Sequence, residues 1–140
     1  ANVLDSFTGQ AVNNGSTVAA PDTTPPTLST ITVVSALLIR FVFDEAVTLS
    51  DLTGWTMASS GAAITFSSST GDTTDTIDVV PSRSVVSTES LSFSYDSGTG
   101  NVTDIATNAL VSITSRLVTN NVSAVAGSGI SRSRLVNQGG

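Results

Sequence analysis

Residues 94–112, SYDSGTGNVTDIATNALVS, gather the side chains of this sequence whose types and spacing could hold a metal ion. Carboxylate and amide oxygens are the ligands that Ca²⁺ prefers, and it takes six to eight of them. The neighbouring pair Asp44-Glu45 could add oxygens if the fold brought it close. The stretch lacks the spacing of an EF-hand loop and contains no glutamate. The candidate ligands in it are Asp96, Asn101, Asp104 and Asn108.

The same residue types also make turns without any ion. Asp and Asn side chains accept hydrogen bonds from nearby backbone N–H groups and tolerate the backbone angles of tight turns. We therefore expect residues 94–112 to turn the chain between two strands, with no metal and no other cofactor bound. A calcium site is the alternative.

Other catalytic chemistry lacks its residues. The sequence has no histidine and no cysteine, and all five of its basic residues are arginine. A Ser-His-Asp triad, a Ser-Lys dyad, a thiolate nucleophile and the usual zinc sites are therefore excluded. Paired carboxylates for glycoside cleavage remain available among eleven acids, but the aromatic residues that would stack a sugar belong to the predicted core. The sequence predicts a protein that is not an enzyme.

Charge is distributed unevenly along the chain. Residues 1–104 carry all eleven acids and two arginines, which gives −9, whereas residues 105–140 carry three arginines and no acid. A net charge of −6 repels nucleic acid and anionic membranes. No apolar run approaches the roughly 20 residues of a membrane span. The basic segment predicts docking onto an acidic protein surface, such as a neighbouring copy.

Three zones follow from composition and periodicity. Residues 1–24 are small and polar and predict an N-terminal arm. Residues 25–122 begin with two prolines, which favour extended chain, and contain nearly all the strong periodicity. Residues 123–140, SAVAGSGISRSRLVNQGG, are rich in Gly and Ser and predict a C-terminal arm.

The period of the middle zone is two, which is typical of half-buried antiparallel strands. In the last run, Val111, Ile113 and Leu117 are expected to point inward and Arg116 outward. Seven such runs, separated by Gly-, Ser-, Thr- and Asp-rich turns, predict an all-β immunoglobulin-like antiparallel sandwich, with a β-barrel as the alternative. The predicted core residues are Leu37, Ile39, Phe41, Phe43, Trp55, Phe66, Phe93, Tyr95, Val111 and Ile113.

The middle zone resembles the immunoglobulin-like repeats of very large bacterial surface proteins, including the cyanobacterial swimming-motility type. Those repeats open with Asp-Thr-Thr-x-Pro, carry Phe-x-Glu-x-Val after the second strand, and end with a Tyr-x-x-Gly-x-Gly loop followed by Asp and Gly-Asn-Ala. Thr107 departs from the pattern, because the family has glycine before Asn108. The resemblance implies a spacer or binding platform. The matching positions are residues 22–26, Phe43–Val47, Tyr95–Gly100, Asp104 and Asn108–Ala109.

A short lysine-free sandwich without a signal peptide and with two arms is expected of a virion part. Tailed bacteriophages place immunoglobulin-like modules on capsids and tails, so we expect a capsid decoration or cement protein that clamps capsid subunits or copies of itself. The alternative is an adhesion or spacer module on a bacterial cell surface or in the extracellular space. The residues expected to bind the protein partner are Arg132, Arg134, Leu135 and Val136.

Overall fold

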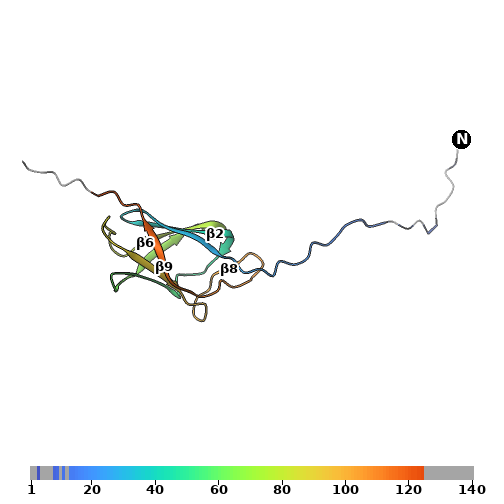
Figure 1. The fold of residues 1–140 in the computed structure, drawn as a ribbon. Coiled ribbons are helices and arrows are strands. Elements are labelled where there is room, and N and C mark those ends of the chain that lie inside the picture. The colour runs from blue at the N-terminus through green and yellow to red at the C-terminus, as the bar shows by residue number, and fades with distance from the viewer. Residues whose placement is uncertain (1–2, 4–7, 10, 12, 125–140) are drawn as a thin grey trace, which may run out of the picture.

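The chain is all-β in a computed structural model, which describes residues 3, 8–9, 11 and 13–124 (Figure 1). The described residues form nine strands and no helix. The strands, in chain order, are β1 (Leu28–Ser35), β2 (Leu38–Thr48), β3 (Trp55–Ser59), β4 (Ala62–Ile64), β5 (Phe66–Thr70), β6 (Thr74–Pro81), β7 (Leu91–Tyr95), β8 (Thr103–Asp104) and β9 (Ile113–Asn120).

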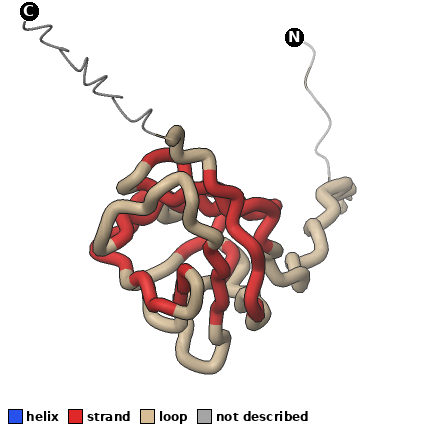
Figure 2. The backbone as a smooth tube through the Cα atoms, turned by 60° about the vertical axis from the view of Figure 1, so that its left-hand side comes forward, coloured by secondary structure: helices blue, strands red, loops and turns tan. Residues whose placement is uncertain are grey.

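Eight strands follow one another in the order β4-β3-β7-β9-β1-β2-β6-β5, and the short β8 pairs with β2. Every neighbouring pair is antiparallel except β1 and β9, which run parallel. The strands wrap round a common interior, so the body is close to a barrel (Figure 2). The all-β prediction is confirmed, and all nine strands lie within residues 25–122.

Buried and outward side chains alternate along β2 and β7, and these two strands form the two main sides, or walls, of the core. Ile39 and Phe41 of β2 are fully buried, and Phe93 of β7 is almost so. The residues between them face outward or lie half-buried, as expected where successive side chains point to opposite faces. The predicted core positions confirmed by burial are Ile39, Phe41, Phe43, Trp55, Phe93 and Tyr95.

Four aromatic rings meet at the centre of this core. The Phe41 ring on β2 contacts Trp55 on β3 and Phe93 on β7, with centroids 4.7 and 4.9 Å away. Trp55 also meets Phe93 at 5.3 Å and Tyr95 at 6.4 Å, and all four contacts are edge-to-face. Edge-to-face pairs place the positive ring edge against the negative face. The cluster therefore joins strands that are not neighbours in the sheet.

Two predicted core residues are wrong. Leu37 is 52% exposed, because it lies in the turn between β1 and β2 and the alternation begins only after that turn. Val111 is 65% exposed, because it precedes β9 and no neighbouring strand covers it. Phe66 and Ile113 are half-buried and pack against the edge of the core.

A β-bulge reverses the expected alternation in β9. Phe93 pairs with Arg116 but Tyr95 pairs with Ile113, so β9 holds one residue more than β7 across this interval. The extra residue lies where Ser115 adopts a φ of 48°. Beyond the bulge Arg116 is half-buried and Leu117 is 77% exposed, the opposite of the prediction.

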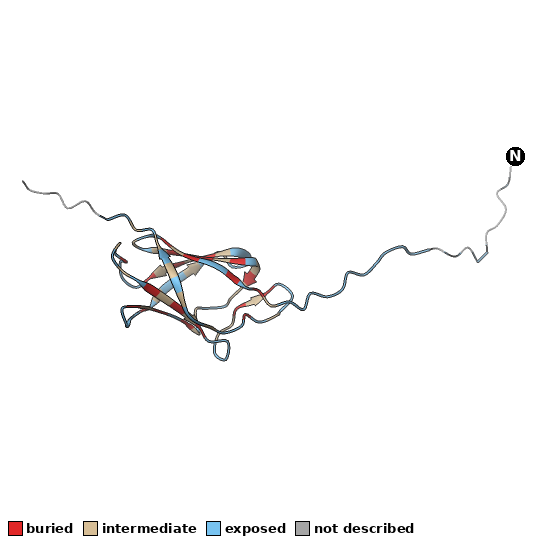
Figure 3. Cartoon of the chain, viewed as in Figure 1, coloured by how far each residue is buried: buried red, intermediate tan, exposed pale blue. Residues whose placement is uncertain are grey.

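The described chain enters the body at one end and leaves at the other (Figure 1). Residues 13–24 form no strand and are exposed, and they run away from the strands next to the start of β1 (Figure 3). After β9, the Asn121 backbone N–H donates to the Val33 carbonyl oxygen, near the β1–β2 turn at the opposite end. The predicted partner-binding residues of the C-terminal arm lie outside the described residues.

Replacing Trp55 by Ala should lower the free energy of unfolding by about 3–5 kcal/mol, because it leaves a cavity that the aromatic cluster cannot close. Chemical denaturation with fluorescence or circular dichroism measures the loss. The control is Leu37→Ala, at an exposed turn position, which should change stability by no more than about 0.5 kcal/mol. Equal losses in the two variants would contradict the assignment of the core.

Candidate functional site

The loop that follows β7 is fastened to the core by Tyr95. Its buried phenol oxygen accepts a hydrogen bond from the Val102 backbone N–H at 3.0 Å. Burial raises the pKa of the Tyr95 hydroxyl, and the hydrogen bond from Val102 opposes this in part. A Cβ at Gly100 would lie 2.3 Å from the tyrosine ring, so glycine is required there. The candidate ligands are thus presented by an anchored loop.

Two of the four candidate calcium ligands stabilise local structure. The Asp96 carboxylate accepts the Gly98 backbone N–H at 2.9 Å, which closes its own turn. The Asn101 side chain accepts the Ser50 backbone N–H at 3.0 Å and donates to the Asp51 carboxylate at 2.6 Å. The side chains of Asp96 and Asn101 therefore each hold loop backbone in place.

The other two candidate ligands lie in contact. Asp104 is 1% exposed, and its two carboxylate oxygens accept the backbone N–H and the side-chain amide of Asn108, each at 2.7 Å. The same amide donates to the Asp22 carbonyl oxygen at 3.2 Å, which ties the segment before β1 to this loop. Thr107, where the resembling family has glycine, adopts the left-handed φ of 75°. Asn108 acts here as a hydrogen-bond donor.

A carboxylate cluster forms around Asp104 from three distant parts of the chain. Oxygens of Asp22, Glu45 and Asp104 all lie within 4.8 Å of one another. Glu45 is a candidate ligand only if the fold brings it close to residues 94–112, and the fold brings it close to Asp104. Asp22 was missed as a ligand, because it lies in the segment assigned to the N-terminal arm. The feature of the sequence that could have identified Asp22 is its position as the first residue of the Asp-Thr-Thr-x-Pro motif.

Glu45 in this carboxylate cluster is harder to ionise than an ordinary glutamate. Burial raises the pKa of its carboxyl, and the charges of Asp104, Asp22 and Asp44 raise it further. The pKa of Asp44 is lowered instead, because Thr27 donates both its hydroxyl, at 2.6 Å, and its backbone N–H, at 2.7 Å. Three carboxylates could supply part of the oxygen shell of a hard cation such as Ca²⁺.

Most of the acidic side chains gather at the same end of the body. Eight of the ten aspartates and glutamates that the structure describes lie there, where β2 ends and β6 begins. Strand pairing and loop contacts place them: Val47 pairs with both Thr74 and Asp104, and the Leu49 N–H donates to Asp72. We call this the acidic end. Its members are Asp22, Asp44, Glu45, Asp51, Asp72, Asp75, Asp96 and Asp104.

The two remaining described acids are paired with arginine. Arg40 holds Asp78 with two hydrogen bonds of 2.8 and 2.7 Å across β2 and β6. Arg83 holds Glu89 in the same way, and this pair, together with the Val86 N–H, lowers the pKa of Glu89 to about 2. Within the described residues, the acidic end is therefore the only place where carboxylates have no arginine partner.

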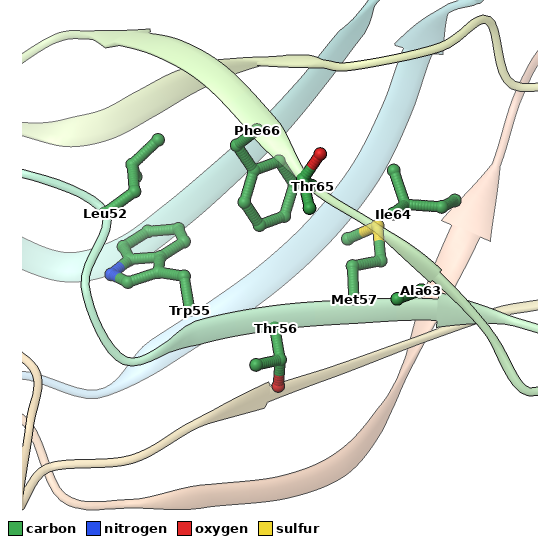
Figure 4. A pocket seen from close by; sticks show the side chains of 8 residues that line it. All are labelled: Leu52, Trp55, Thr56, Met57, Ala63, Ile64, Thr65 and Phe66. Carbon is green, nitrogen blue, oxygen red and sulfur yellow. The ribbon is translucent and has the colours of Figure 1, made fainter.

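A small apolar cavity of about 280 Å³ lies beside Trp55, between β3 and the start of β5 (Figure 4). Leu52, Met57 and Phe66 contribute apolar side chains to it, whereas Thr56 points away. The Trp55 indole N–H is buried and has no hydrogen-bond partner among the described residues. The cavity offers apolar surface.

No protein-family model, no curated protein and no solved structure matches this chain. The resemblance to bacterial immunoglobulin-like repeats therefore rests on the motifs quoted above. In the described part of the chain, nothing forms a helix of the length and apolarity needed to cross a membrane.

Replacing Glu45 by Gln should stabilise the protein at neutral pH in metal-free buffer. The raised pKa of Glu45 means that ionisation costs stability, so the cost grows as pH rises above the ordinary value of 4.5 and vanishes below it. Glu89→Gln is the matched control with opposite sign, because its lowered pKa adds stability that is lost as pH falls from 4.5 toward about 2. Thermal melts of each variant and of the wild type across this pH range measure both effects. If the stability difference from the wild type changes with pH in the same direction for both variants, the assignment is refuted.

Replacing Thr107 by Gly should raise the free energy of unfolding by up to about 1 kcal/mol. A left-handed backbone costs a non-glycine residue about 1–2 kcal/mol, and the added chain entropy of glycine removes about half of the gain. Thr119→Gly, at an exposed position of β9, should instead lose about 0.5–1 kcal/mol. The prediction fails if denaturation shows the same loss for both variants.

Proposed function

We propose that this protein is a non-enzymatic structural module that joins other protein subunits, and that its body is an immunoglobulin-like β-sandwich. Strands β4 and β8 span only three and two residues, which leaves seven longer strands, the number expected for such a sandwich. Support also comes from the packing of β2 against β3 and β7 through the aromatic cluster. The body then serves as a rigid platform.

The observation that carries the proposal is the separation of the two chain ends at opposite ends of an acidic body. Residues 13–24 are exposed and lie beside the acidic end, and the described chain leaves the body at the other end (Figure 1). The segment that follows, residues 125–140, carries two arginines and no acid. Flanking segments that continue from these two ends would reach different neighbouring subunits, and the charges of the two segments differ.

The specific form that we propose is a capsid decoration or cement protein of a tailed bacteriophage, located in the virion. The sandwich faces outward, and the arms at 1–24 and 123–140 lie across capsid subunits. Arg132 and Arg134 pair with carboxylates of the partner, while Leu135 and Val136 enter an apolar site. Several such contacts per particle give an avidity that a single arm lacks.

One observation favours a second candidate, a spacer or adhesion module of a bacterial cell surface. The Asp22, Glu45 and Asp104 carboxylates meet where the chain enters the body, and the chain leaves at the opposite end. Tandem copies stacked end to end would place these carboxylates at each joint, where Ca²⁺ could bridge two modules.

Mass spectrometry of purified virions separates the two candidates. The decoration protein should be recovered in many copies per particle and should be released by washing at high salt, because exposed arginine–carboxylate contacts are screened. A gene that encodes tandem copies behind a secretion signal, with no copy in virions, favours the cell-surface module.

Deleting residues 125–140 should abolish attachment to particles while the melting temperature stays nearly unchanged, because all nine strands lie between residues 28 and 120. Binding to undecorated particles, followed by sedimentation, measures attachment. The control is Leu37→Ala in the full chain, which should attach normally. A truncated protein that still reaches full occupancy rules out the clamping role of the C-terminal arm.

A further inference from the structure

The sheet is not fully closed between β1 and β9. These two strands pair only at Thr32 with Thr119 and at Val33 with Asn120. On the side of these pairs that faces the acidic end, the first half of β1 and the first half of β9 form no backbone pairs. Each strand therefore has a stretch whose edge on this side lacks a neighbour, and such an edge accepts an additional extended chain.

An apolar cleft of about 380 Å³ lies along this opening. The half-buried Arg116 guanidinium reaches across it and donates to the carbonyl oxygens of Leu28 and Ser29 on β1. An arginine side chain thus satisfies carbonyl groups that a neighbouring strand would normally bind. The apolar residues that line the cleft are Pro25, Pro26, Leu28, Leu110, Val111 and Ile113.

An apolar side chain stands exposed at the cleft, because Val111, which lines it, is 65% exposed. Thr24 and Pro25, which line one wall, follow closely after Asp22 of the carboxylate cluster. The cleft therefore combines exposed apolar surface with neighbouring negative charge, and it calls for an occupant that is apolar and basic.

We propose that this cleft binds residues 130–136, ISRSRLV, of a second copy of the chain. This deepens the proposed function and rests on it, because it names the partner of the C-terminal arm. The segment carries Arg132 and Arg134, no acid, and the apolar pair Leu135-Val136. Its guanidinium groups pair with carboxylates of the acidic end, and its apolar residues enter the cleft. Its backbone extends the open edge of β9, because Arg116 already binds the Leu28 and Ser29 carbonyl oxygens of β1.

The described chain leaves the body at the end opposite to the cleft. Asn121 donates to Val33 beside the β1–β2 turn, and Val122 and Ser123 line a groove near that turn. In the proposed contact, the basic segment that follows these residues reaches the acidic end of the next copy. Contacts between different surfaces of identical subunits are heterologous and join copies head to tail.

Sedimentation velocity of the full chain over a range of concentrations tests the proposal. Association should increase with concentration and weaken as NaCl is added, because arginine–carboxylate contacts are screened. Val111→Arg in the cleft and Leu135→Asp in the arm should each weaken association at least about tenfold, since each removes a buried apolar contact and adds a like charge. Leu37→Arg, an exposed apolar position at the opposite end, is the matched control and should associate like the wild type.

Mixing the two defective variants gives the sharpest readout. Val111→Arg keeps an intact arm and Leu135→Asp keeps an intact cleft, so an equimolar mixture should recover one joint and stop at one copy of each. If Val111→Arg fails to fold, Val111→Ser replaces it, because it removes the apolar contact at the same cleft position without adding a charge. A wild-type chain that stays monomeric at every concentration overturns the proposal, including the case in which the arm folds back into its own cleft. A mixture that recovers nothing, or equal effects of Leu37→Arg and Val111→Arg, overturns it as well.

Failure of this inference and failure of the proposed function give different results. A chain that is recovered from virions but never self-associates keeps its structural role and loses the head-to-tail contact. A chain that self-associates through the cleft but binds no particle and lies in no tandem array keeps the contact and loses the proposed function.

Discussion

The edge-to-face contacts of Phe41 with Trp55 and Phe93 are the interaction on which the rest of the structure depends. Strand β2 is separated from β7 in the sheet by β9 and β1, so these rings close the curled sheet on itself. A buried aromatic side chain removes about 150–250 Å² from water, which stabilises the fold by about 4–6 kcal/mol before entropy is counted. Because the cluster holds the two walls together, loops at both ends of the body acquire fixed positions.

The fixed loops explain why charge collects at one end. Carboxylates are costly to bury without partners, and the outward positions of the strands are mostly serine and threonine. Most of the acids therefore lie in loops and at strand ends, and the strand order brings those loops together where β2 ends and β6 begins. Burial, together with repulsion from the neighbouring carboxylates, raises the pKa of Glu45, so this end of the molecule gains from any cation or guanidinium that approaches it.

Local alternation predicted the parts of the fold that depend on it. The patterns of Ile39–Phe43 and Leu91–Tyr95 identified both walls of the core, because a strand with one buried face shows its orientation in its sequence. Leu37 and Leu117 were misplaced, because a turn and a bulge reset the alternation without a clear local signal. The carboxylate cluster was predicted only through Asp104 and conditionally through Glu45, since contacts with Asp22 arise from tertiary structure.

Native-state hydrogen exchange measured residue by residue tests the closure by the aromatic cluster most directly. Amides of β2 and β7 should exchange only through global unfolding and should report one common free energy, because Phe41 and Phe93 belong to one cooperative core. Exchange of β3 and β7 at a clearly lower free energy than β1, β2 and β6 would show that the two walls open independently, and would contradict this account.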